Sequence, residues 1–316
     1  MASAGIGILG LTACGKEKKE DHATTSEEKT PMIEPFFKLS LAQWSIHRMV
    51  REQGLNPFEF AAKAKSWGFE GLEYVTQLYE KTLEKPNGID LFVKESKLRS
   101  MDQGIADLIL MVDHEGDLAV LDEAERSKAI DNHKKWMDAA AAMGCHSIRI
   151  NLFGTNDPEE WKPISIDSLG KLGEHGKTVN VNVLVENHGW LSSNGQLLSE
   201  VMQQVNHPYC GTLPDFGNFC VKRKDGSRWG ECEEEYDRYK GMKEIMPFAK
   251  AVSAKSYDFD EAGNETTIDY SRMLRMVHDF GYTGFIGVEY EGKRMSEEEG
   301  ILATKDLLIK AAQQFT

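Results

Sequence analysis

The chain has 316 residues, of which 41% are hydrophobic and 28% are charged, and its formal net charge is −14 at pH 7. This composition is typical of a soluble globular protein with a sizeable hydrophobic core. The acidic balance excludes nucleic acid as an expected partner, because binding to a phosphate backbone requires clustered lysine and arginine side chains.

The first 35 residues differ in composition from the rest of the chain. An apolar run too short to span a bilayer ends in "LTAC", residues 11–14, and a charged run follows. This tetrapeptide resembles a bacterial lipobox, although no Lys or Arg precedes the run. We predict that residues 1–35 form a lipoprotein signal and flexible tether, with Cys14 as the lipidation site. The protein would then be exported and lipid-anchored to the cell envelope, in the periplasm or at the outer membrane. The alternative is an unstructured tail with a chance cysteine.

From about Phe36 onward, short β-rich runs alternate with stretches that carry helix signals. The runs cover residues 37–44, 68–75, 104–112, 146–154, 181–187, 209–216, 249–259 and 284–292. Their spacing fits strands that are each followed by a crossover helix, which is the signature of a parallel sheet.

Helix-capping signals support the intervening helices. They occur at Asn56-Pro57, at Asp122, and at Ser296 with Glu299. Eight strand–helix units predict one α/β domain over residues 36–316, folded as a closed (β/α)₈ TIM barrel. A doubly wound open sheet is the alternative, but the first run ends in "AQWSIHR" and carries no glycine-rich phosphate loop.

The longest connection, residues 220–239, follows the sixth run. It is too polar and irregular for a core element, so we interpret it as a wall of a substrate site, with a decorative insertion as the alternative. Cys220 and Cys232 flank this loop and are expected to form a disulfide if the compartment is oxidising. Cys145 and Cys210 lie beside apolar runs and are predicted to be small core residues.

The carboxyl ends of the predicted strands carry many polar side chains, and in TIM barrels the reacting residues lie at these ends. The residues found there are His47, Glu73, Asp113, His114, Arg149, Asn151, Glu186, Asn187, His188, Asp215, Asn218, Lys255, Asp258, Glu289 and Glu291. Residues two apart on a strand point the same way, so Glu186 and His188 are expected to share a side.

Four segments, "VENHGW", "PDFGNF", "SAKSYDFDEAGNETTIDY" and "GYTGFIGVEYEG", make residues 36–316 resemble the sugar phosphate isomerase/epimerase superfamily, the xylose isomerase-like TIM barrels. In ketose epimerases of this group a divalent metal is held by side chains from strands five to eight. The resemblance implies Glu186, Asp215 and Glu289 as ligands here. Two departures weaken it: Ser253 stands where a metal-binding His is expected, and Asn218 stands where the group frequently has a His.

The chemistry of such a site can be argued from the residues. Three carboxylates in one pocket repel one another unless a cation or protons intervene, and oxygen donors suit Mn²⁺ or Mg²⁺ better than zinc. A divalent metal would acidify the C–H beside a carbonyl and stabilise an enediolate, and the resemblance implies that Glu186 and Glu289 exchange the proton. His188 and Lys255 are further catalytic candidates. Their alternatives are a loop histidine bonded to backbone and a buried ion pair.

Further polar and aromatic residues are candidates for substrate binding, each with a structural alternative as an ion pair or a core residue. They are Glu73, Arg149, Asn151, Asn187, Trp190, His47 and His114. Among these, Trp190 is expected to stack on the face of a sugar.

The main hypothesis is an isomerase or epimerase that acts on an unphosphorylated sugar or keto-sugar. The first alternative is a lyase or hydratase that eliminates from a 3-keto-sugar or glycoside, since the same proton abstraction serves both. The second is a non-catalytic sugar-binding lipoprotein, which the missing strand-seven His keeps open. A DNA-repair endonuclease is disfavoured, because it would need more metal-binding histidines and a basic groove.

Overall fold

The computed structural model describes residues 34–315. Cys14 and most of the predicted signal and tether lie outside these residues. The eight strands of the main sheet are β1 (Lys38–Ala42), β2 (Gly71–Val75), β3 (Ala106–Met111), β4 (Ser147–Ile150), β5 (Asn182–Glu186), β6 (Cys210–Leu213), β9 (Val252–Ser256) and β10 (Phe285–Tyr290). Each strand lies inside one of the eight predicted runs.

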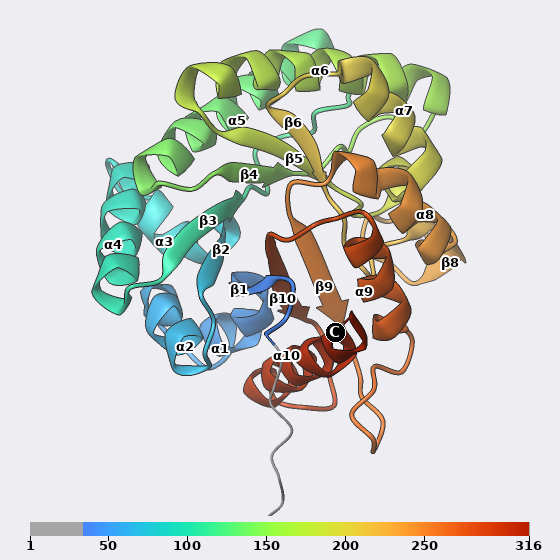
Figure 1. The fold of residues 1–316 in the computed structure, drawn as a ribbon. Helices are drawn as coiled ribbons and strands as arrows, with labels where there is room; N and C mark the ends of the chain where they lie inside the picture. The colour runs from blue at the N-terminus through green and yellow to red at the C-terminus, as the bar shows by residue number, and fades with distance from the viewer. Residues whose placement is uncertain (1–33, 316) are drawn as a thin grey trace, which may run out of the picture. The chain divides into compact units, whose positions relative to one another are not determined.

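Neighbouring strands of the main sheet run parallel in the order β6-β5-β4-β3-β2-β1-β10-β9. Parallel bridges between Thr212 and Ala249 and between Asp215 and Ser253 join β6 to β9 and close the ring. The closed barrel is therefore confirmed, and the doubly wound open sheet is wrong. Figure 1 shows the strands at the centre with the helices around them.

The helices alternate with the strands along the chain. They are α1 (His47–Arg51), α2 (Phe60–Ser66), α3 (Glu80–Leu83), α4 (Gly88–Gln103), α5 (Glu123–Met143), α6 (Pro158–Val179), α7 (Gly195–Val205), α8 (Arg238–Ile245), α9 (Tyr270–Asp279) and α10 (Glu297–Ala312). Within residues 34–315, no helix combines the length and apolarity that crossing a membrane would require.

The predicted capping residues begin the helices where expected. The Asp122 carboxylate accepts a hydrogen bond from the backbone N–H of Glu125 at the start of α5, and Ser296 and Glu299 form a reciprocal capping box at the start of α10. Asn56 caps a short 3₁₀ turn, η2 (Pro57–Glu59), and α2 follows it directly. Hydrogen bonds between residues close in the sequence thus define where these helices begin.

The strand β5 explains why an apolar run ends in charged residues. Val183, Leu184 and Val185 are fully buried, because the barrel interior covers one face of the strand and helices cover the other. Glu186 ends the strand and remains buried. The strand therefore places a buried carboxylate at the carboxyl end of the sheet.

The connection after β6 differs from the irregular loop that we predicted. It contains an antiparallel hairpin of β7 (Cys220–Arg223) and β8 (Cys232–Glu235), and a disulfide joins Cys220 to Cys232. The strand β8 is mostly charged and exposed, and β7 buries Cys220 alone, so neither sequence has the apolar alternation of a core strand. The remaining cysteines in the described part of the chain, Cys145 and Cys210, are buried free thiols, as expected.

Candidate active site

A cavity of about 850 Å³ opens where the barrel strands end. Of the residues proposed from the sequence, His114, Arg149, Asn151, His188 and Glu289 line it. This is the end of the barrel at which reacting groups are expected, since the loops after the strands can vary without disturbing the core.

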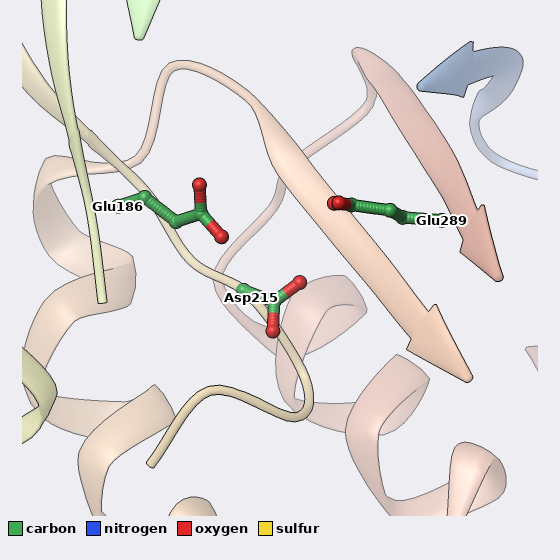
Figure 2. A group of neighbouring side chains, drawn as sticks. All are labelled: Glu186, Asp215 and Glu289. Carbon is green, nitrogen blue, oxygen red and sulfur yellow. The ribbon is translucent and has the colours of Figure 1, made fainter. Parts of the chain in front are cut away.

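Three carboxylates meet at this end of the barrel. Glu186 comes from β5, Asp215 follows β6, and Glu289 lies on β10. One oxygen of each lies within 4.8 Å of an oxygen of the other two, and all three residues are buried. Figure 2 shows the three carboxylate groups turned toward one another. The convergence that the sequence reading required is therefore present.

Basic and amide groups hold two of these carboxylates in place. The Arg149 Nε lies 2.9 Å from Glu186 Oε2, and the Asn218 Nδ2 donates a 2.9 Å hydrogen bond to Glu186 Oε1. Asp215 Oδ1 accepts hydrogen bonds of 2.9 Å from the backbone N–H groups of Gly217 and Asn218. The tight turn after β6 thus fixes the rotamer of Asp215, and the side chain of Asn218 links that turn to Glu186.

Ser253 occupies the position where the resemblance implies a metal-binding His. Its hydroxyl donates a 2.6 Å hydrogen bond to Asp215 Oδ2 and lies 3.2 Å from Glu289 Oε2. A hydroxyl at this point connects two of the carboxylates but supplies no imidazole nitrogen. The candidate metal ligands are therefore oxygen atoms.

Lys255 lies inside the barrel rather than on the cavity wall. Its Nζ lies 2.9 Å from Glu289 Oε1 and 2.7 Å from Glu291 Oε1, and its side chain is fully buried. Burial alone would lower the pKa of this lysine, but the two carboxylates raise it well above its ordinary value. The same ammonium overcomes the effect of burial on Glu291 and lowers its pKa. Lys255 is thus a buried cation paired with β10, which matches the structural alternative.

Burial raises the pKa of Asp215 to about 8, with the Lys255 ammonium lowering it and the Glu186 and Glu289 carboxylates raising it further. The pKa of Glu289 is also raised by burial, despite Lys255. A nearby cation stabilises the charged form of buried carboxylates whose pKa values are raised in this way. The donor set fits a divalent ion bound by Glu186, Asp215 and Glu289, because three buried oxygen donors converge within reach of one ion.

A chain of hydrogen bonds orients His188. The Asn151 Nδ2 donates to Asp113 Oδ1 at 2.8 Å, so its amide oxygen faces His188 Nδ1 at 2.7 Å. Because an amide oxygen only accepts, Nδ1 must carry a proton, which leaves Nε2 as the basic nitrogen. Asp113 also pairs with Arg149 at 2.9 Å, and this guanidinium overcomes burial to lower the pKa of Asp113.

Glu73 points into the barrel interior and does not line the cavity. Ser40 on β1 donates a 2.6 Å hydrogen bond to Glu73 Oε1, while Oε2 is buried and has no hydrogen-bond partner within residues 34–315. Burial raises its pKa from 4.5 to about 8. On β10, Gly287 leaves the space for this side chain, since a Cβ there would lie 2.5 Å from Glu73 Oε1. The structure thus places Glu73 as an enclosed acid rather than at the cavity surface.

The remaining candidates occupy separate places. Asn187 bonds backbone groups of Asp215 and Asn218, so it organises the turn that carries Asp215. His47 stacks on Trp44 and lies 3.3 Å from a carboxylate oxygen of Glu297, outside the cavity lining. Trp190 lines a neighbouring pocket of about 280 Å³ and is not part of the lining of the larger cavity.

Three cavity residues on the hairpin and its turn were not predicted from the sequence, namely Arg223, Arg228 and Trp229. The interpretation of residues 220–239 as a wall of the site agrees with this placement. A signal existed in "DGSRWG", where a glycine-flanked turn presents an arginine beside a tryptophan. Nothing in the sequence, however, shows toward which side of the barrel mouth the turn folds.

Residues 61–311 match the family model described as xylose isomerase-like TIM barrel. This match covers most of the chain, which therefore belongs to that family. The superfamily proposed from the sequence motifs is confirmed, and the expectation of an enzyme in the isomerase or epimerase class agrees with this membership.

Two curated relatives match short segments. A 3'-dehydrocarminate deglycosidase alpha subunit from Microbacterium sp. is 44% identical over 48 residues, which is 15% of this chain and 14% of that protein. A C-glycoside deglycosidase alpha subunit from Arthrobacter globiformis is 41% identical over 54 residues, 17% of this chain and 15% of that protein. The aligned segments span less than a fifth of either relative.

Solved structures match along most of their length. The 3-keto-D-glucoside 4-epimerase of E. coli has a TM-score of 0.66 at 12% identity, covering 87% of this chain and 99% of that chain. An L-ribulose 3-epimerase has a TM-score of 0.66 at 12% identity, covering 88% and 96%. A Mycobacterium smegmatis protein in complex with magnesium has a TM-score of 0.62 at 15% identity, covering 89% and 99%. At these identities the likeness shows a shared fold.

Proposed function

We propose that this chain is a sugar isomerase or epimerase that transfers a proton at the carbon beside the carbonyl of an unphosphorylated keto-sugar. The observation that carries the proposal is the convergence of Glu186 and Glu289, from separate strands, beside a cavity large enough for a carbohydrate. Two carboxylates on different sides of one carbon can remove a proton from one face and return it to the other. The epimerases among the structural neighbours support this reading.

The surrounding residues serve this proton transfer by fixing charges before the substrate arrives. The Arg149 guanidinium and the Lys255 ammonium neutralise charge beside Glu186 and Glu289, and both lie on rigid strands. Fixed dipoles and charges of this kind cost little reorganisation during reaction. A divalent ion held by Glu186, Asp215 and Glu289 would polarise the carbonyl and lower the pKa of the neighbouring C–H. It would be Mn²⁺ or Mg²⁺, as the oxygen donors favour.

Product analysis on a panel of keto-sugars tests the proposal. We expect the wild-type chain to convert a 3-keto-glucoside or a ketohexose to an isomer of equal mass, and Glu186→Gln and Glu289→Gln to lose at least about 1,000-fold in kcat. Glu265→Gln is the matched control, because Glu265 is equally buried but caps a backbone turn near α9. Turnover that survives both site substitutions would contradict the assignment. An inert wild type that still binds the sugars would favour the non-catalytic binder.

A second candidate is elimination from a 3-keto-glycoside, which the deglycosidase names of the two short-segment relatives favour. A carboxylate would take the proton from C2, the C–H electron pair would form the C1–C2 double bond, and the bond from C1 to the aglycone would break. His188, when protonated, would supply the proton that the leaving aglycone requires. The free aglycone and an unsaturated keto-sugar, found by mass spectrometry, would establish this reaction, whereas an epimerase leaves the glycoside intact.

We also propose export to the cell envelope through lipidation of Cys14. The Cys220–Cys232 disulfide supports it, because such bonds persist in oxidising compartments. An unphosphorylated substrate is consistent with such a location. Cys14→Ala should release the protein from the membrane fraction of its native host, and unchanged fractionation would contradict the proposal.

A further inference from the structure

The turn of the β7–β8 hairpin carries an exposed tryptophan into the cavity wall. Trp229 is 60% exposed, yet its ring contacts Phe153 with centroids 5.6 Å apart and His188 with centroids 5.1 Å apart. A large aromatic side chain that is exposed and also held by two rings presents a fixed flat surface. The exposed part of this surface takes no part in the packed interior of residues 34–315.

Two connections hold the hairpin over the barrel mouth. At its base, the disulfide joins Cys220 to Cys232. At its turn, the Arg228 Nη2 donates a 2.7 Å hydrogen bond to Asp117 Oδ2 in the connection after β3, and the guanidinium lies 4.2 Å from the centroid of the Phe153 ring. The turn is thus tied to segments far away in the sequence, which places Trp229 without burying it.

The cavity is larger than a single sugar ring needs. Its volume of about 850 Å³ lies near the upper end of the range for sites that enclose drug-sized ligands. The smaller pocket of about 280 Å³ shares Phe153 and Arg228 with it and adds Trp161 and Trp190 to its lining. The cavity and its aromatic lining therefore extend beyond the three carboxylates, on the side of His188 that faces the hairpin.

The groups around this surface favour a particular chemistry. Phe153 and Trp229 are aromatic, and Arg223 and Arg228 offer only hydrogen-bond donors; the Nε of Arg223 is buried without a hydrogen-bond partner among the described residues. The carboxylate of Asp117, one of the acceptors near this surface, is already paired with Arg228. A second sugar ring presents hydroxyl groups that need acceptors as well as donors. A flat aromatic ring with phenolate or carbonyl oxygens needs only stacking and donors.

We propose that the cavity contains a subsite for an aromatic aglycone, formed by Trp229, Phe153 and Arg228, so that the substrate is an aryl glycoside of the keto-sugar. The inference rests on the proposed function for the sugar end and extends it to the group attached at C1. The sugar lies at Glu186 and Glu289, His188 lies at the junction, and the aglycone stacks on Trp229.

The test compares 4-nitrophenyl and methyl 3-keto-β-glucosides. We expect the wild type to show kcat/KM at least about tenfold higher for the aryl compound, and Trp229→Ala to reduce this ratio to about one. Trp229→Phe should restore most of the preference. Phe280→Ala, another exposed aromatic, is the control and should leave the ratio unchanged. A wild-type ratio near one, or an equal loss on both substrates in Trp229→Ala, would overturn the subsite.

Calorimetry with the unoxidised 4-nitrophenyl and methyl β-glucosides separates this proposal from the proposed function, because it needs no turnover. The subsite predicts an aryl Kd at least about tenfold lower than the methyl Kd, a difference that Trp229→Ala removes. Equal dissociation constants in the wild type would overturn the subsite. A preference for the aryl compound in a protein that turns over neither keto-glucoside would retain the subsite and reject the proton-transfer function.

Discussion

Glu73 is a carboxylic acid enclosed among the strands, and its environment has a measurable consequence. Its pKa is raised by burial from 4.5 to about 8, so between these values the folded state holds a proton that the unfolded chain releases. Its contribution to the free energy of unfolding is complete below pH 4.5 and is lost as the pH rises through about 8. The loss amounts to several kcal/mol, about 5 at most.

Glu73→Gln should therefore flatten the pH dependence of stability. Urea unfolding at pH 5 and pH 9 measures it: the wild type should lose several kcal/mol more than the variant over this interval. Comparing slopes cancels the pH-independent cost of the new amide. Equal slopes for the two proteins would show that Glu73 does not titrate in this window.

His188 depends on Asn151 for its orientation. Asn151→Ala removes the acceptor that holds the proton on Nδ1, so we expect kcat to fall about 10- to 100-fold with little change in KM. Steady-state kinetics on the substrate found in the panel measures this. Asn182→Ala, at the start of the neighbouring strand β5, is the control and should keep kcat within about threefold. Equal losses in both variants would indicate a general effect on the barrel rather than the loss of the bond between Asn151 and His188.

Residues at the carboxyl ends of strands could be placed from the sequence, whereas residues enclosed by neighbouring strands could not. Glu186, Asp215 and Glu289 could be placed at one end of the barrel from the sequence, because carboxyl ends of parallel strands meet there, and the family resemblance singled them out among the strand-end residues. The enclosure of Glu73 could not, since it depends on the register that sets Ser40 of β1 opposite β2 and on the missing side chain of Gly287. The burial of Lys255 likewise follows from its alignment with Glu289 across β9 and β10.

At the scale of elements, the disulfide in the β7–β8 hairpin controls the position of the turn. Replacing Cys220 and Cys232 together by Ser removes a constraint worth about 3 kcal/mol in chain-entropy terms, acting mainly on the hairpin itself. We expect faster proteolysis within residues 224–231 and a loss of at least about threefold in affinity for the aryl glucoside, with methyl turnover retained. The thermal midpoint of the barrel should change little.

Limited proteolysis with mass spectrometry, and calorimetry on the same samples, check this prediction. A Cys145→Ser and Cys210→Ser double variant is the control, since these buried thiols lie outside the hairpin. A hairpin that resists the protease equally with and without the disulfide would show that the ion pair between Arg228 and Asp117 suffices to hold it.

Elements were predictable where a periodic apolar pattern or a cap existed. All eight barrel strands lay in the predicted runs because strands buried on both faces are continuously apolar. The hairpin was not predicted, because exposed strands such as Cys232–Glu235 carry charges on most positions and are stabilised by pairing and a disulfide rather than by burial. An apolar periodicity in the sequence indicates which residues are buried, and an exposed hairpin buries few residues.

At the scale of the whole molecule, stability should respond to divalent metal in a pH-dependent way. Below about pH 8 the raised pKa of Asp215 means that a proton competes with the ion for its carboxylate. We expect saturating Mn²⁺ to raise the thermal midpoint by several degrees at pH 8.5, and by less at pH 6, with EDTA reversing both. Asp215→Asn should abolish the response. An unchanged midpoint at pH 8.5 would show that the three carboxylates do not hold the ion.

We propose that Glu186 and Glu289, which converge beside one cavity, move a proton beside a keto-sugar carbonyl. Incubation of a 3-keto-glucoside with the protein in D₂O, followed by NMR, tests it most directly. We expect the wild type to catalyse deuterium incorporation at the carbon next to the carbonyl, or into the product derived from it, and Glu186→Gln and Glu289→Gln not to do so. Product formed without any deuterium, or exchange that persists in both variants, would contradict the account.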